Sequence, residues 1–313
     1  MDLAVALAGL ALLLVAGDLL VRGAVGFSLR AGVPSLIVGL TVVAFGTSAP
    51  ELLISVQAAL DDAPGIALGN VVGSNIANIL LVLGAPALIS TLDGRASDTR
   101  KSYLFMIVVS VVFIALGFAG PLSWWHGLVL LSLLILMLAD AFRDSRAGPD
   151  AEVEGVDPDA ARMARGRIAL FLVLGLIGLP AGAHLLIEGA RNLALDLGIS
   201  EAAIGLTLVA VGTSLPELAT TVMAAFRREA DVALGNVIGS NVFNLAAVMG
   251  VTALIADVPV GAEFLTRDLW VMLAASAVLA PFVMGKAVMT RWVGAAFLAA
   301  YVGYAALALG AAA

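Results

Sequence analysis

The sequence contains no cysteine, only two histidines and few charged residues. Without cysteine the chain has no disulfide, no thiolate metal site and no thiol nucleophile. Two histidines are too few for a zinc site. Charged residues make up 12% of the chain, whereas soluble domains carry about 25%. This scarcity excludes an ordinary cytosolic enzyme, a disordered chain and a nucleic-acid-binding protein.

Apolar residues, in contrast, make up 62% of the 313 residues, and the mean hydropathy is +1.09. A core of this size cannot bury so much apolar surface, so we expect an all-α membrane protein within a lipid bilayer. About 20 apolar residues cross a bilayer as a helix. Glycine, proline and charge divide the chain into ten such predicted spans, at 3–29, 34–60, 64–91, 102–119, 122–142, 168–195, 200–226, 231–256, 268–285 and 290–310.

A polar stretch divides the ten spans into five and five. The expected organisation is a first five-helix repeat over 1–142, a cytoplasmic linker over 143–167 and a second five-helix repeat over 168–313. Basic residues favour the cytoplasmic side of a membrane. With the N-terminus outside, only Arg191 and Arg267 of the 16 basic residues lie on the outer side. Both termini are therefore predicted to lie outside.

The two halves share sequence at a constant offset of 166 residues. Residues 39–52 match residues 205–218 at eleven of fourteen positions, and residues 67–78 match residues 233–244. Because each half has five spans, an odd number, the second copy enters the membrane in the opposite orientation. Such inverted-topology repeats recur in secondary transporters, whose sites lie near the membrane midplane where the repeats meet.

Two glutamates, Glu51 and Glu217, occupy equivalent positions in the second and seventh spans. A carboxylate at that depth is costly and marks an ion pathway. Each follows a proline, Pro50 or Pro216, which cannot donate to the carbonyl four residues earlier and therefore kinks the helix. The kinks predict free carbonyls beside the hydroxyls of Thr47, Ser48, Thr213 and Ser214.

The third and eighth spans add serine and asparagine at equivalent positions. Residues four apart share a helix face, and on this basis we expect four residues to line the site: Ser74, Asn78, Ser240 and Asn244. Four further asparagines fit either a site or hydrogen bonding between helices: Asn70, Asn75, Asn236 and Asn241.

Carboxylates, carbonyls and hydroxyls form an all-oxygen ligand set, which suits the hard cations Ca²⁺ and Na⁺. Two glutamates would neutralise one Ca²⁺ or two Na⁺, and a proton could replace a cation. Competition for this pair would suffice for coupled exchange at a site that opens to one side at a time. The alternatives are a Ca²⁺/H⁺ antiporter and, from another class, a passive cation channel. No cofactor is expected.

The motifs Gly-Thr-Ser-x-Pro-Glu and Gly-Ser-Asn-x-x-Asn each occur twice, at 46–51 and 212–217 and at 73–78 and 239–244. They resemble the alpha-repeats of the sodium/calcium exchanger family, within the calcium/cation antiporter superfamily. The resemblance covers essentially the whole chain and implies a prokaryotic, multi-pass protein of the inner membrane. It also implies that helices one and six slide against a core of helices two, three, seven and eight.

The resemblance further implies a ligand set for each ion. Ca²⁺ would bind the carboxylates of Glu51 and Glu217 and the carbonyls of Thr47 and Thr213. Na⁺ would use both glutamates with Ser48, Ser74, Ser214, Ser240 and the carbonyls of Ala44 and Ala210. Asn78 and Asn244 would complete the centre.

One position departs from part of the family, because many relatives have aspartate where this chain has Asn244. The centre then carries two carboxylates, which the resemblance connects with potassium-independent transport. The resemblance favours Na⁺ over H⁺ coupling for a separate reason, because the proton-coupled branch usually lacks the Thr-Ser-x-Pro-Glu form. Each repeat pair makes a complete site, so a monomer could suffice.

Charged residues also occupy equivalent positions on the first and sixth spans. Asp18 and Arg22 are four residues apart, and His184 and Glu188 occupy the matching positions. The favoured interpretation is an ion pair near a helix end. The alternative is that these pairs gate helix sliding or sense pH.

Overall fold

The computed structural model describes residues 2–61, 63–92, 99–147, 163–196, 212–285 and 287–312. Within these ranges every regular element is a helix, as the sequence predicts. Eight helices are long and apolar enough to cross a membrane, and the bent pair Ser35–Thr47 and Ala49–Leu60 adds a ninth if it forms one span. Of the predicted span at 200–226, residues 200–211 lie outside the described ranges, as does most of the predicted linker.

The first half of the chain contains ten described helices. In chain order they are α1 (Asp2–Ala31), α2 (Ser35–Val38), the π-helix η1 (Gly39–Val43), α3 (Ala44–Thr47), α4 (Ala49–Leu60), α5 (Pro64–Ala77), the π-helix η2 (Asn78–Val82), α6 (Gly84–Ile89), α7 (Arg100–Ala119) and α8 (Trp124–Ala147).

The second half repeats this order among its described residues. It contains α10 (Arg165–Asp196), α13 (Leu215–Phe226), α14 (Ala230–Val242), the π-helix η4 (Phe243–Val248), α15 (Met249–Ile255), the π-helix η5 (Phe264–Asp268), α16 (Leu269–Val278), α17 (Ala280–Val283) and α18 (Arg291–Ala312).

The backbone follows the 166-residue repeat closely. The helices α4 and α13 are both 12 residues long, and each follows a serine, Ser48 or Ser214, with φ −86° and ψ 5°. Two isolated β-bridges lie at nearly equivalent places in the halves, joining Leu92 to Met289 and Leu122 to Val258.

The predicted proline kink is confirmed in the first half. The axis bends by 43° between Ser35–Thr47 and Ala49–Leu60. Proline stands in the first turn of α4, where its missing N–H would be unpaired in any case. The kink therefore ends one helix at Thr47 and begins a new one directly before Glu51.

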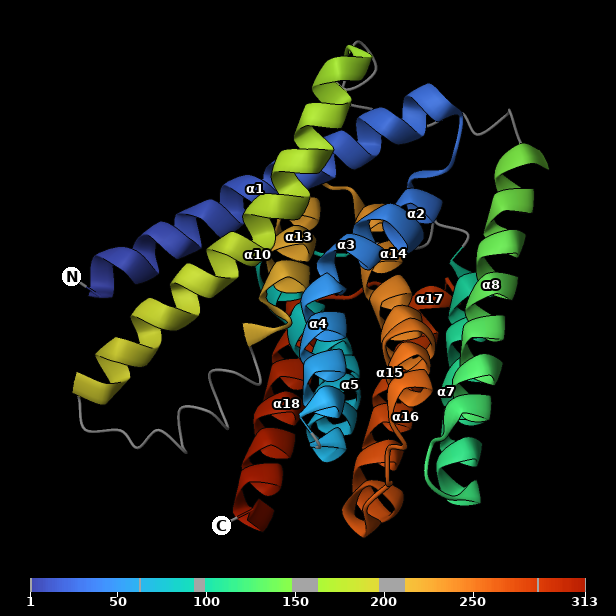
Figure 1. Cartoon of the computed structure of the whole chain (residues 1–313). Helices are drawn as coiled ribbons and strands as arrows, with labels where there is room; N and C mark the ends of the chain where they lie inside the picture. The colour runs from blue at the N-terminus through green and yellow to red at the C-terminus, as the bar shows by residue number, and fades with distance from the viewer. Residues whose placement is uncertain are drawn as a thin grey trace.

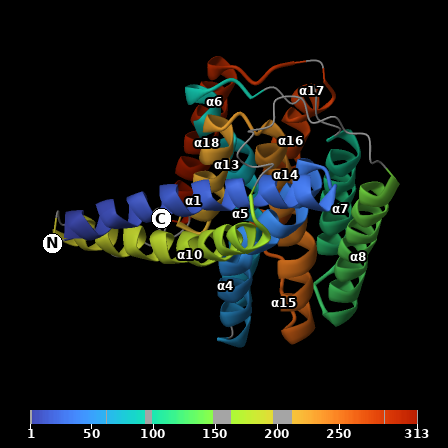
Figure 2. The ribbon, with the colours of Figure 1, turned by 90° about the horizontal axis from the view of Figure 1, so that it is seen from above.

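The long helices α1 and α10 lie side by side across the rest of the bundle (Figures 1 and 2). They run antiparallel, and glycines bring their backbones together. A Cβ on Gly182 would lie 2.8 Å from the backbone nitrogen of Leu13, and one on Gly175 would lie 2.6 Å from Cβ of Leu20. Small residues permit this close packing of membrane helices, and the two helices therefore form one unit.

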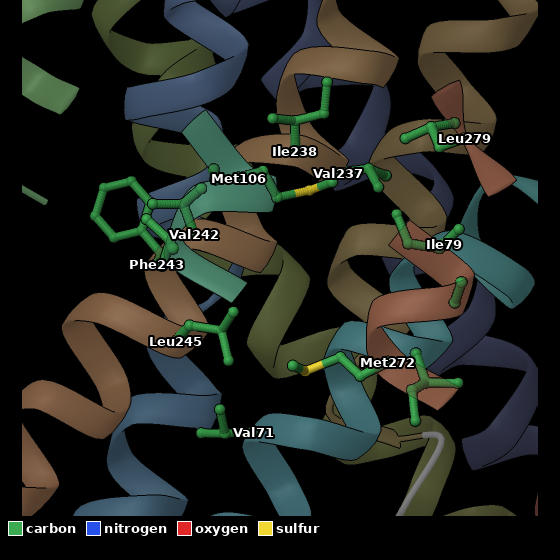
Figure 3. Packing of buried hydrophobic residues seen from close by; sticks show 14 of the residues in the cluster. Val71, Ile79, Met106, Val237, Ile238, Val242, Phe243, Leu245, Met272 and Leu279 are labelled. Atoms are coloured by element: carbon green, nitrogen blue, oxygen red, sulfur yellow. The ribbon is translucent and has the colours of Figure 1, made fainter. Parts of the chain in front are cut away.

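A large hydrophobic cluster lies among the helices that α1 and α10 cross, and buried side chains from both halves of the chain pack together in it (Figure 3). It includes buried side chains from α5, η2, α7, α14, η4 and α16, among them Val71, Ile79, Met106, Val237, Leu245 and Met272.

Many large apolar side chains point away from the protein. On α1 alone Leu3, Leu7, Leu10 and Leu14 are exposed, the first of them by 58%. Soluble monomers rarely expose contiguous apolar surface on this scale. Lipid is the surrounding medium that these side chains require.

Candidate cation site

The two Gly-Thr-Ser-x-Pro-Glu turns of the repeat each place a glutamate at the start of a helix. Glu51 stands in the first turn of α4, and Glu217 stands in the first turn of α13. Both side chains are completely buried. The positive end of a helix dipole favours a negative charge in its first turn, so the break in each helix helps to hold a carboxylate inside the bundle.

Hydroxyl groups connect each turn with the opposite half of the chain. Ser48 Oγ donates to Glu217 Oε1 at 3.1 Å. The hydroxyls of Thr47 and Ser240 lie 3.4 Å apart, and those of Thr213 and Ser74 lie 3.5 Å apart. The last two contacts are equivalent under the repeat. The structure therefore brings together the turns and the serines that the sequence placed in one site.

Several oxygen atoms at this centre have no hydrogen-bond partner although they are buried. Buried polar atoms are nearly always paired, and an unpaired buried carboxylate is especially costly. A cation would supply the missing interaction. Among the described residues the unpaired oxygens here are Glu51 Oε1 and Oε2, Glu217 Oε2, Ser214 Oγ, Asn78 Oδ1 and Asn244 Oδ1.

Asn78 and Asn244 both lie on π-helical segments, η2 and η4. A π-helical turn is wider than an α-helical turn and occurs frequently at functional sites. Asn78 Nδ2 donates to Asn241 Oδ1 at 3.0 Å, which leaves Asn78 Oδ1 available. The sequence predicted these asparagines but not the π-helices, for which its helix periodicity carries no signal.

Two of the four ambiguous asparagines form a reciprocal pair between α5 and α14. Asn75 Nδ2 donates to the carbonyl of Asn241 at 3.3 Å, and Asn241 Nδ2 donates to the carbonyl of Asn75 at 3.4 Å. These two residues are 166 apart, so the pair lies where the two halves meet. Their amides hold the two helices together.

The other two ambiguous asparagines also connect helices. Asn70 Nδ2 donates to Ser55 Oγ at 3.0 Å, and Asn236 Nδ2 donates to Thr221 Oγ1 at 3.2 Å. These bonds are again equivalent under the repeat. Asn236 Oδ1 also accepts from Thr47 Oγ1 at 3.2 Å, which connects it with the edge of the site.

The family resemblance assigns two backbone carbonyls to Na⁺, those of Ala44 and Ala210. The carbonyl of Ala44 accepts from the nitrogen of Ser48 at 3.0 Å and from Thr47 Oγ1 at 3.3 Å. Ala210 lies outside the described residues.

In the described part no three residues of the types His, Cys, Asp and Glu gather as a metal-binding group, consistent with a centre built on two carboxylates.

An apolar helical bundle with unpaired oxygen atoms at its centre is the architecture of a membrane protein that handles cations. The family model described as "Sodium/calcium exchanger protein" matches residues 1–142 and 167–310. The chain belongs to this family, whose members are membrane antiporters rather than enzymes.

Individual relatives match nearly the full length of the chain. The putative antiporter CaxA of Alkalimonas amylolytica is 37% identical over 306 residues, 95% of each chain. The sodium/calcium exchanger MaX1 of Methanosarcina acetivorans is 31% identical, again over 95% of each chain. A solved structure of the sodium-calcium exchanger NCX_Mj, soaked with 2.5 mM Na⁺ and 1 mM Sr²⁺, superposes with a TM-score of 0.84 at 36% identity over 97% of each chain.

Proposed function

We propose that this protein exchanges Ca²⁺ for Na⁺ across the cytoplasmic (inner) membrane, with the two glutamates as the shared cation ligands. The observation that carries the proposal is the cluster of buried, unpaired oxygens around Glu51 and Glu217. Oxygen atoms alone, with two negative charges, suit one Ca²⁺ or two Na⁺. Relatives named as sodium/calcium exchangers support the same pair of ions.

The ligands divide between the ions as follows in this proposal. Ca²⁺ binds both carboxylates and the carbonyls of Thr47 and Thr213, while the serine hydroxyls serve Na⁺. The Ala44 carbonyl already accepts two hydrogen bonds, so its use by Na⁺ requires the turn to open locally. Ser48, Ser74, Ser214, Ser240, Asn78, Asn244 and Ala210 complete the proposed set.

Inverted topology supplies the mechanism of alternation. In this proposal the halves at 1–142 and 168–313 cross the membrane in opposite directions, with both termini outside and the linker 143–167 inside. Each conformation then has a counterpart in which the two halves exchange roles. The α1–α10 unit is the part that moves against the core. One chain contributes both halves of the site, so a monomer suffices for exchange.

Calcium uptake into proteoliposomes tests the proposed coupling. Purified protein is reconstituted, and radioactive Ca²⁺ uptake is measured under an imposed Na⁺, K⁺ or H⁺ gradient, with protein-free liposomes as the control. Uptake should follow an outward Na⁺ gradient and should not respond to K⁺. Uptake that follows only a pH gradient would identify a Ca²⁺/H⁺ antiporter, and flux without any counter-ion gradient would identify a channel.

A further inference from the structure

An ion-pair network away from the cation site ties α1 to α13. Asp18 Oδ1 accepts from both Nε and Nη2 of Arg227, each at 2.5 Å. Arg22 Nη1 lies 3.8 Å from Asp18 Oδ2, and the Arg22 guanidinium lies 5.0 Å from the ring centre of Phe171 on α10. The network therefore connects the α1–α10 unit with the core, through a contact that sequence spacing did not reveal.

The 166-residue repeat assigns a counterpart to each member of this pair. Asp18 corresponds to His184, and Arg227 corresponds to Asp61. The correspondence is structural as well, because Arg227 is the C-cap residue of α13 and Asp61 is the C-cap residue of α4. The counterpart is thus an acid and a base in exchanged positions, with the acid on the core helix and the base on the long helix.

In the described conformation this second pair is apart. The His184 side chain is 80% exposed, and its Nε2 lies 3.8 Å from Glu188 of the same helix. The Asp61 carboxylate accepts from Gln57 of the same helix at 2.9 and 3.0 Å, and among the described residues it has no other side-chain partner. A negative charge at a helix C-terminus is unfavourable, and a donor from outside the helix would relieve it.

Helix packing shows the same difference between the two ends of the α1–α10 unit. α1 packs extensively against α13, whereas α10 makes no comparable contact with α4, the counterpart of α13, among the described residues. In the described part the unit therefore packs closely on α13 but not on its counterpart α4, although it also contacts α2, η1 and α3 of the first half.

We propose that Asp18–Arg227 and His184–Asp61 are two side-chain pairs that form in alternation during the transport cycle. We call them latches, because each would hold the α1–α10 unit against one half of the core. The first latch holds the α1–α10 unit in the described conformation. The second closes when the unit moves to the other half of the core, with the imidazole N–H donating to the carboxylate. The inference rests on the alternation in the proposed function, and it assigns four positioning residues that touch neither ion.

Cross-linking of paired cysteines tests the latches directly, because the natural chain contains no cysteine. One variant carries Asp18→Cys with Arg227→Cys, and the other carries Asp61→Cys with His184→Cys. A short bifunctional thiol reagent should join either pair in membranes, and each cross-link should arrest exchange until it is cleaved. A chain with all four cysteines should form one cross-link or the other, but not both.

Single charge changes should shift the balance between the two cross-links in opposite directions. Arg227→Gln should raise cross-linking of the 61–184 pair by roughly two- to fivefold, the range expected for a partly exposed ion pair. Asp61→Asn should raise cross-linking of the 18–227 pair to a similar extent. Asp140→Asn is the matched control, because it breaks the 2.7 Å ion pair with Lys101 between α7 and α8.

Cross-linking needs no ion flux, so its result is independent of the coupling ion. The latches would be disproved if the 61–184 pair never cross-links in active protein, or if Arg227→Gln acts no differently from Asp140→Asn. Alternating cross-links in a chain that does not exchange Ca²⁺ for Na⁺ would instead contradict the proposed function and leave the latches supported. Ca²⁺ binding by each variant confirms that the cation site remains folded.

Discussion

The two halves of the molecule have closely similar backbones among the described residues, but the hydrogen bonds of their buried glutamates differ. Glu217 accepts from Ser48 at 3.1 Å and from Ser240 at 3.5 Å. Under the repeat, Glu51 should accept from Ser214 and Ser74, yet neither of its carboxylate oxygens has a hydrogen-bond partner among the described residues. Equivalent motifs thus give one glutamate with two serine donors and one with no serine donor in the described part of the chain.

Symmetric and asymmetric contacts lie close together in this duplicated fold. The reciprocal bonds from the amides of Asn75 and Asn241 to each other's carbonyls are symmetric. In contrast, the bond from Asn78 to Asn241 has no counterpart among the described residues, and of the equivalent helices α4 and α13 the α1–α10 unit packs closely on α13 alone in the described part. If the halves are inverted, as proposed, this conformation has a counterpart in which the two halves exchange roles. The proposed alternating access is the exchange between these two conformations.

The largest predicted effect comes from removing either carboxylate. Glu51→Gln and Glu217→Gln should each abolish measurable Ca²⁺ transport and weaken Ca²⁺ binding roughly a hundredfold or more, since loss of one buried charged partner costs about 3 kcal/mol. Binding is measured by isothermal calorimetry and transport by radioactive uptake. Because both halves supply a ligand, the two variants should be similarly inactive.

Glu263→Gln provides the control for this comparison, because Glu263 is exposed and lies outside the site. It should transport at the wild-type rate. Normal Ca²⁺ affinity in Glu51→Gln or Glu217→Gln would remove the carboxylates from the proposed ligand set.

The sequence was sufficient to predict much of this site because duplication repeats its chemistry. The glutamates, the proline-associated break and the facing serines appear twice at a fixed offset in an apolar background. Buried polar residues in such a background have few structural roles. The pattern therefore predicted which residues would lie together, and that the resulting cluster binds cations stays a proposal.

Other features depend on packing between the halves and have no local signature. The π-helices that contain Asn78 and Asn244 directly continue α5 and α14. Arg227 pairs with Asp18, 209 residues away, although spacing along one helix suggested only Arg22. The offset also could not show which glutamate would be left without donors, because both halves carry the same serines.

The next effect should arise where α1 meets α10. Gly182→Ala would place a Cβ 2.8 Å from the backbone nitrogen of Leu13, so the helices must separate, at a cost of about 1–3 kcal/mol. We expect a lower melting temperature in detergent and slower exchange. Gly303→Ala is the control, because a Cβ there meets nothing within 4 Å. Equal melting temperatures for both variants would show that this helix pair tolerates separation.

A smaller effect is expected where α5 meets α14. Asn75→Ala removes one amide donor, from a bond of 3.3 Å, and should lower the free energy of unfolding by about 1 kcal/mol. Asn241→Ala removes the equivalent bond of 3.4 Å and also the acceptor of Asn78 Nδ2 at 3.0 Å, so its loss should be roughly twice as large. Thermal unfolding of both single variants measures this. Equal losses would show that the bond from Asn78 to Asn241 contributes nothing to stability.

The smallest effect concerns the two serines that distinguish the halves. In Ca²⁺-free detergent, Ser48→Ala should lower the unfolding free energy by about 1 kcal/mol, because Ser48 donates to the buried Glu217 carboxylate. Ser214→Ala should be neutral or slightly stabilising, because in the described part of the chain its buried hydroxyl has no hydrogen-bond partner. Each variant is the control for the other, and both keep the same helix break.

A cross-link between cysteines at positions 18 and 227 should widen the stability difference between the two serine variants. The cross-link removes the proposed counterpart conformation, in which the two serines exchange roles. Equal losses in the cross-linked protein would mean that the asymmetry at the carboxylates does not belong to this conformation.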